Sequence, residues 1–260
     1  MAKIYIDTCV LPRCQLETAK IYREAFGDIG FELLPMFDMP EFEPNLEANL
    51  DFLREVPVCF HEPVFFVEHS APKGSPEYVQ SMHHLALTKK YADILHPSHM
   101  VYHLNNCKVT PDTKAQMLRT SLANLEEIQE IFTGVRILVE NTGTDVKGDK
   151  LLDQQEFTDL CRQNNFDVLI DIGHANANSW DITRLITDLK TQIRAFHLHN
   201  NDGIHDLHNR LTDGTLNFPE VMQHIRTETP DADLVIEYTS PKYHGQPLLE
   251  DIETLCRTIR

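Results

Sequence analysis

The sequence has few features of a membrane, secreted or nucleic-acid-binding protein. Basic residues are scarce, since 23 Lys and Arg stand against 40 Asp and Glu, a formal net charge of −17. Such a surface repels phosphate backbones and anionic lipid, because binding to either depends on clustered cations. No apolar run approaches the ~18 residues of a membrane span. The start, MAKIYIDTCV, lacks the basic and apolar regions of a signal peptide. We therefore expect neither nucleic acid nor a membrane as partner.

Cysteine pairs of the kind found in disulfide frameworks and zinc ribbons are also missing. The six cysteines form no CxxC motif, and they are Cys9, Cys14, Cys59, Cys107, Cys161 and Cys256. Several of them lie inside apolar runs, as small buried thiols do. Scattered cysteines of this kind predict reduced thiols in a cytoplasmic protein. With 42% hydrophobic residues, the chain can bury a large core.

Short apolar runs alternate with longer amphipathic segments along the chain. The runs that predict strands are KIYIDTC at 3, FELLPMF at 31, VPVCFHE at 56, HMVYHLN at 99, VRILVEN at 135, FDVLIDIGH at 166, IRAFHLH at 193 and DLVIEYT at 233. Helices are expected between them, among others at 76–95, 112–132, 153–163 and 248–258. This alternation predicts parallel strands joined by right-handed crossovers.

Eight such units in ~250 residues, with no Pro/Gly-rich linker, predict an α/β fold, a single (β/α)8 TIM barrel over 1–260. A doubly wound open sheet is the alternative, but no GxGxxG motif follows the first strand.

Metal-binding residue types stand where six successive strands end. The ends of the third to eighth runs carry His61, His103, Glu140 with Asn141, Asp171 with His174, His197 with His199, and Glu237; the loop after the seventh adds Asp206 and His208. The carboxyl ends of barrel strands share one rim, where catalytic groups lie. Buried carboxylates and imidazoles are costly without a partner, so this ring predicts a bound divalent cation. The remaining histidines considered, His83, His84, His96, His205 and His224, are expected at the surface.

The ordered set of motifs resembles the xylose isomerase-like TIM-barrel superfamily, which includes sugar isomerases and epimerases and endonuclease IV-type enzymes. The motifs are CFHEPVF, MVYHLN, ILVENTG, LIDIGHA, FHLHNNDGIHDLHNRLTDGTLNF and VIEYT. The resemblance implies that one divalent ion is held by Glu140, Asp171, His197 and Glu237. Further metal or substrate contacts are expected at His61, His103, His174, His199, Asp206 and His208. Carboxylate ligands suit Mn2+, Mg2+ or Co2+, whereas a His-rich cluster favours Zn2+.

The resemblance further implies an isomerase or epimerase of a ketose or related keto-sugar or cyclitol. The reaction is expected to be proton transfer through a metal-stabilised enediolate, with Glu140 and Glu237 as the acid/base pair. The substrate, a small carbohydrate, is predicted to contact His174, Asn141 and Arg210. Two alternatives stay open: a metal-dependent lyase or dehydratase, and an endonuclease IV-like phosphodiesterase with several zinc ions. The sequence also leaves open whether the protein forms a homo-oligomer.

Overall fold

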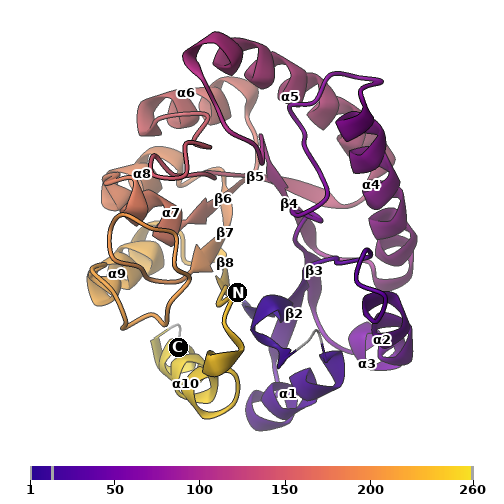
Figure 1. Ribbon diagram of the computed structural model, residues 1–260. Helices are drawn as coiled ribbons and strands as arrows, with labels where there is room; N and C mark the ends of the chain where they lie inside the picture. Colours follow the sequence, from indigo (N-terminus) through magenta and orange to yellow (C-terminus); the bar gives the residue numbers. More distant parts are fainter. Residues whose placement is uncertain (1, 13–14, 259–260) are drawn as a thin grey trace.

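The computed structural model describes residues 2–12 and 15–258. Eight parallel strands pair in chain order, and the last pairs with the first to close the barrel. The strands are β1 (Ile4–Asp7), β2 (Ile29–Leu33), β3 (Val58–Phe60), β4 (His99–His103), β5 (Arg136–Glu140), β6 (Val168–Asp171), β7 (Ile193–Leu198) and β8 (Asp233–Ile236). Figure 1 shows the helices arranged around this ring of strands. The predicted (β/α)8 barrel and its eight strands are confirmed.

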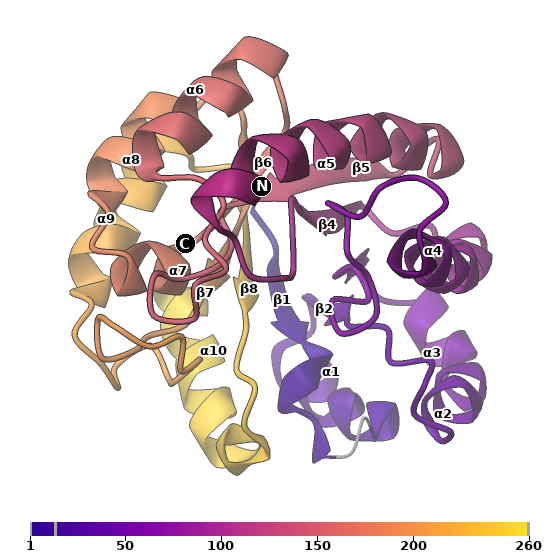
Figure 2. The ribbon, with the colours of Figure 1, turned by 45° about the horizontal axis from the view of Figure 1, so that its top comes forward.

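The helices fill the connections between strands. They are α1 (Lys20–Phe26), α2 (Phe42–Ala48), α3 (Leu50–Arg54), α4 (Pro76–Leu95), α5 (Pro111–Ile131), α6 (Gln154–Asn164), α7 (Ile172–Ala177), α8 (Ile182–Leu189), α9 (Phe218–Glu228) and α10 (Gln246–Thr258), with 3-10 turns η1 (Thr8–Val10), η3 (Leu16–Ala19) and η4 (Pro241–Tyr243). The four helices predicted by range correspond to α4, α5, α6 and α10. Figure 2 shows α4 and α5 on one side of the barrel and α8, α9 and α10 on the other.

The two longest helices begin where local sequence signals place them. The Ser75 hydroxyl accepts from the Tyr78 amide at the start of α4. The Thr110 hydroxyl accepts from the Thr113 amide at the start of α5, and the Thr113 hydroxyl accepts from the Thr110 amide. Each helix has proline at its first position, where no intrahelical amide bond is lost. The predicted start at 76 coincides with Pro76, and the predicted start at 112 lies one residue after Pro111.

The barrel interior is packed in layers rather than open. Inward-facing apolar residues form two small clusters, Val101–Leu138–Leu169–Ala195 and Tyr5–Cys59–Val235. All of them are at most 1% exposed. Alternate residues of a strand face the same side, so the inward positions nearer the carboxyl ends follow directly on these layers. Those positions are occupied by the polar residues of the predicted ring.

Some surface predictions need correction or lie outside the described residues. The expectation that His84 is on the surface is wrong: it is buried, and its ring stacks on Phe66 with centroids 4.6 Å apart, because this face of α4 packs against the loop after β3. His205 is exposed, as expected. The five described cysteines are free thiols in the structure, while Cys14 lies outside the described residues. Among the described helices, none has the length and apolar character of a membrane span.

Candidate metal centre

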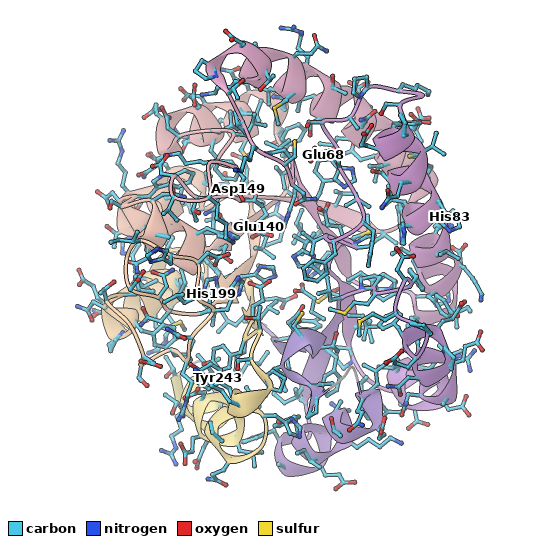
Figure 3. All side chains as sticks on the ribbon, viewed as in Figure 1. Glu68, His83, Glu140, Asp149, His199 and Tyr243 are labelled. Atoms are coloured by element: carbon cyan, nitrogen blue, oxygen red, sulfur yellow. The ribbon has the colours of Figure 1, made fainter. Side chains whose placement is uncertain are left out.

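The ring of polar residues forms at the carboxyl ends of the strands, as predicted. His103, Glu140 and Asp171 are the last residues of β4, β5 and β6. His61 and Glu237 directly follow β3 and β8. All five are buried, with exposures from 0% to 8%. Figure 3 labels Glu140 and His199 on the part of the barrel wall formed by β5 to β7. Barrel closure therefore gathers side chains that are far apart in sequence.

The first part of the ring joins two histidines to Glu140. The Nε2 atom of His103 lies 2.9 Å from Glu140 Oε2, and the Nε2 atom of His61 lies 4.0 Å from the same oxygen. The two imidazoles meet edge to face, with centroids 4.9 Å apart. His103 is held from behind, because its Nδ1 atom shares a 2.8 Å hydrogen bond with Asn106 Oδ1. These residues present two imidazoles and one carboxylate to the same space.

The second part lies at the centre of the ring and contains His197 on β7 and His199 directly after it. His199 Nε2 is 3.0 Å from Asp171 Oδ2 and 3.9 Å from Glu237 Oε2. His197 lies deeper, and its Nδ1 atom is 3.6 Å from Glu140 Oε1 and 3.5 Å from Glu237 Oε2. Both imidazoles are completely buried. The structure thus brings the four predicted ligands together with His199, which the sequence predicts as a further metal or substrate contact.

The third part comes from the loop after β7 and from α7. Asp206 lies between two imidazoles, with Oδ1 2.9 Å from His208 Nε2 and Oδ2 3.4 Å from His174 Nε2. The His208 ring stacks on His199 with centroids 3.9 Å apart. Lys147 completes the group, since its Nζ atom donates to Asp206 Oδ2 at 2.7 Å. The D-x-H pair therefore folds back onto the ring, as the sequence pattern predicts.

Two local features hold the centre of the ring in place. The Asn141 amide donates to the Asp171 carbonyl and accepts from its amide, which ties β5 to β6. The Asp171 carboxylate in turn accepts from the His174 amide and caps α7. At Gly173 an added Cβ would overlap the His199 ring, so glycine is required for the close approach of that imidazole. The side chain of Asn141, which the sequence predicts to contact substrate, is instead hydrogen-bonded to the backbone of Asp171.

The donor set fits a divalent cation. One ligand atom from each member lies within 4.8 Å of the others in His61–Glu140–His197, in Glu140–Asp171–His174, in His174–Asp206–His208 and in His199–His208–Glu237. Ligands ~2.0–2.3 Å from one zinc ion reach such separations. Among the described residues, His174 Nδ1, His197 Nδ1 and Glu237 Oε2 are buried without a hydrogen bond of acceptable geometry. Buried polar atoms are normally satisfied, so their convergence here indicates a positive partner.

The electrostatics of the metal-free ring show what a cation would replace. Burial alone raises the pKa of the Glu140 carboxyl, but attraction to His103 and His197 outweighs it and holds the pKa well below its usual range. Burial alone lowers the pKa of His103, but Glu140 and Glu62 outweigh it and raise that pKa to about 9. Protonated imidazoles therefore neutralise the carboxylates. A divalent ion would take over this role by displacing the protons.

The structure gives Arg210 and Glu32 roles that the sequence does not predict. Arg210 lies away from the ring, because its Nε and Nη2 atoms donate to the Asp251 carboxylate at 2.9 and 2.8 Å and so tie the loop to α10. Glu32, outside the predicted set, is fully buried and its Oε1 atom lies 2.8 Å from His197 Nε2. A carboxylate paired with one imidazole nitrogen orients the other toward a metal. The one sequence signal for Glu32 is a charge inside the apolar run FELLPMF.

A cavity of about 380 Å³ opens above the ring. Beside ring members, its lining includes Cys9, Leu34, Val64, Phe65, Asn105, Asn106, Thr142, Gly143, Lys147, Asp149 and Thr239. Lys147 is the only lysine or arginine among the described lining residues, and it is paired with Asp206. The cavity is therefore mostly neutral above an acidic and imidazole-rich floor.

Comparison with known proteins agrees with this architecture. Residues 28–258 match the family described as xylose isomerase-like TIM barrel. An uncharacterized protein of Methanocaldococcus jannaschii is 26% identical over 130 residues, which are 47% of this chain and 44% of that protein. The match thus spans less than half the length of this relative.

Solved structures share the whole fold at low identity. A D-tagatose 3-epimerase-like protein is 19% identical, with a TM-score of 0.77 over 99% of this chain and 97% of the other. An AP endonuclease of family 2 from Brucella melitensis is 15% identical, with a TM-score of 0.71 over 99% of each chain. The IolI protein with a bound zinc atom is 17% identical, with a TM-score of 0.70 over 98% of this chain and 96% of the other.

Proposed function

The chain belongs to the xylose isomerase-like TIM-barrel family, and from this premise we propose that it is a divalent-metal-dependent isomerase or epimerase of a ketose or related keto-sugar. The observation that carries the proposal is the placement of Glu140 and Glu237. They come from β5 and the end of β8, yet their carboxylates lie 4.0 and 3.9 Å from the same atom, His61 Nε2. Two carboxylates can therefore face one small substrate from different sides. The similarity to a D-tagatose 3-epimerase-like protein supports this chemistry.

The proposed reaction moves a proton at a carbon next to a carbonyl. A divalent ion held by the ring would act as a Lewis acid toward that carbonyl and the neighbouring hydroxyl. One carboxylate, Glu140 or Glu237, takes the proton from one face of the carbon. The other returns a proton to the opposite face, which inverts the centre and gives an epimer. Each carboxylate has an imidazole beside it, His103 at 2.9 Å and His208 at 3.3 Å, through which its proton can be exchanged.

The cavity suggests which carbohydrates would fit. Its volume of about 380 Å³ lies in the range of small-molecule sites. The pairing of Lys147 with Asp206 leaves no unpaired lysine or arginine among the described lining residues to bind a phosphate group. Asn106 and Thr142 supply polar groups suited to sugar hydroxyls. A neutral, unphosphorylated sugar is therefore the proposed substrate.

The test is metal content combined with solvent isotope exchange. Protein purified without chelator should carry a divalent ion and should exchange a carbon-bound proton of at least one ketose with deuterium from D2O. Glu140→Gln should abolish both, whereas Arg210→Gln, outside the ring, should retain both. Absence of bound metal, with none taken up on adding Mn2+, Co2+ or Zn2+, would contradict the proposal. Exchange that persists in Glu140→Gln would contradict the acid/base assignment.

Phosphodiester hydrolysis is a second candidate function. It is favoured by the metal-binding side chains that the site holds in addition to Glu140, Asp171, His197 and Glu237. His61 with the neighbouring His103, and Asp206 with His174 and His208, supply enough donors for two or three zinc ions. The net charge of −17 speaks against a nucleic-acid substrate. Two or three Zn2+ ions per chain, one of them lost in Asp206→Asn, together with cleavage of a phosphodiester and no ketose exchange, would favour this candidate. One ion that survives Asp206→Asn would favour the isomerase.

A further inference from the structure

A second polar cluster lies inside the barrel, below the ring. It consists of Glu32 on β2, Cys59 on β3 and His99 on β4, three strands that follow one another around the barrel. Glu32 pairs in register with Cys59, and the pairing of Phe60 with Met100 places His99 beside Cys59. The three residues are 0%, 0% and 3% exposed. Branched apolar residues usually fill such positions of a barrel, so a carboxylate, a thiol and an imidazole side by side require a reason.

The contacts within the cluster leave one imidazole nitrogen of His99 without a hydrogen bond. Glu32 divides its oxygens: Oε1 is bound by His197, whereas Oε2 lies 3.5 Å from Cys59 Sγ. His99 Nδ1 shares a 3.0 Å hydrogen bond with Ser98 Oγ. The other ring nitrogen, His99 Nε2, is buried without a hydrogen-bond partner among the described residues. One ligand atom from each of the three residues lies within 4.8 Å of the other two.

At the end of the barrel opposite the ring, a cavity borders one member of this cluster, His99. A cavity of about 340 Å³ is lined there by Ser98, His99 and residues around the start of β8, including Asp233. His99 lines this cavity, whereas Glu32 and Cys59 do not. The charged residues that line this cavity are three acidic ones, Glu228, Asp231 and Asp233, and three basic ones, Arg136, Lys190 and Arg194, so its formal charges balance.

We propose that Glu32, Cys59 and His99 form a separate binding site for a thiophilic divalent cation of the Zn2+ type. Binding breaks the Cys59 S–H bond, the thiolate becomes a ligand, and the proton is released to solvent without any change of oxidation state. A thiolate with an imidazole and a carboxylate selects Zn2+ or Co2+ over Mg2+ and Mn2+, which prefer oxygen ligands. The site goes beyond the proposed function and does not depend on it.

Cobalt spectroscopy tests the site on the full chain. Metal-stripped protein titrated with Co2+ should develop a thiolate-to-cobalt charge-transfer band in the near ultraviolet, and Mg2+ should produce none. Cys59→Ser should lose the band. Two matched variants should keep it: Cys9→Ser, which changes the cysteine that lines the cavity above the ring, and Cys161→Ser, which changes another fully buried thiol, on α6. His99→Leu should weaken the band without removing metal from the ring.

Several results would overturn the proposal. They are a wild-type protein that saturates with Co2+ without a charge-transfer band, a band that survives Cys59→Ser, and a band lost in Cys9→Ser but not in Cys59→Ser. If Cys59→Ser fails to fold, as judged by its melting curve, wild-type crystals soaked in ZnCl2 decide the question. An anomalous peak between Glu32, Cys59 and His99 supports the site, and no peak there refutes it.

Discussion

Raising the pH should destabilise the metal-free protein while strengthening its binding of metal. The cause is the set of buried imidazoles in the ring. Burial lowers the pKa of His103, but Glu140 and Glu62 outweigh this and raise it to about 9. The pKa values of His174, His197 and His208 are also raised. An imidazole with a raised pKa in the folded state stabilises the fold fully below its unfolded pKa and loses this effect as the pH rises through the folded value.

The magnitude follows from His103 alone. The difference between 6.5 and about 9 corresponds, at about 1.4 kcal/mol per pH unit, to about 3.5 kcal/mol of folding free energy. For a chain of this size that is a fall in Tm of roughly 7–14 °C as the pH rises over this interval. The pKa of His99, lowered by burial to about 4, changes its contribution only at more acidic pH. With metal bound, the ion replaces the protons and the loss should disappear.

Differential scanning calorimetry across this pH interval, in chelator and in saturating Zn2+ or Mn2+, measures the effect. His103→Gln should flatten the slope of the metal-free protein. His84→Gln is the matched control, because His84 is a buried imidazole outside the ring whose pKa is lowered by burial; its slope should stay that of the wild type. The reasoning would be refuted if the Tm of the metal-free protein rose or stayed level as the pH increased. It would also be refuted if the Tm of the metal-bound protein fell by the same amount.

Two further substitutions separate structural from functional roles. Gly173→Ala should weaken metal binding and cost about 1–3 kcal/mol, because the new Cβ overlaps the His199 ring; calorimetry and metal titration measure this, and a gain in Tm would show that the overlap is relieved. Arg210→Gln should lower stability by about 1–3 kcal/mol through loss of its bonds to Asp251 and leave KM unchanged. A raised KM at unchanged Tm would return Arg210 to the substrate site.

Local sequence was sufficient for the elements of the fold and for the rim on which the site lies. Strands and helices differ in the period of their apolar residues, and the caps at Ser75 and Thr110 mark helix starts through contacts with residues three positions away. Eight strand runs separated by helices leave few topologies other than a closed barrel. Once the barrel is assumed, its strand ends must meet, and the ring from His61 to Glu237 follows.

The contacts within the ring could not be predicted, because they join residues that are far apart in sequence and local patterns give no distances between such residues. Asn141 and Arg210 were predicted to contact substrate, but the amide of Asn141 pairs with the Asp171 backbone and the guanidinium of Arg210 pairs with Asp251 on α10. Whether a polar residue beside a strand end faces the cavity or supports a neighbour depends on what packs against it. His84 shows the same limit on a helix, because its burial results from Phe66 of a preceding loop.

By itself, then, the sequence determined the barrel and the polar rim, since both arise from periodicity and from where each apolar run stops. Only the tertiary structure decided which atoms are neighbours across the barrel. Glu32 and His197 are separated by 165 positions and meet at 2.8 Å, while Glu32, Cys59 and His99 stand in one row because β2, β3 and β4 pair in a particular register. Register and closure are set by the packing of the whole barrel, so a buried pair or a second cluster becomes visible only when all eight strands are in place.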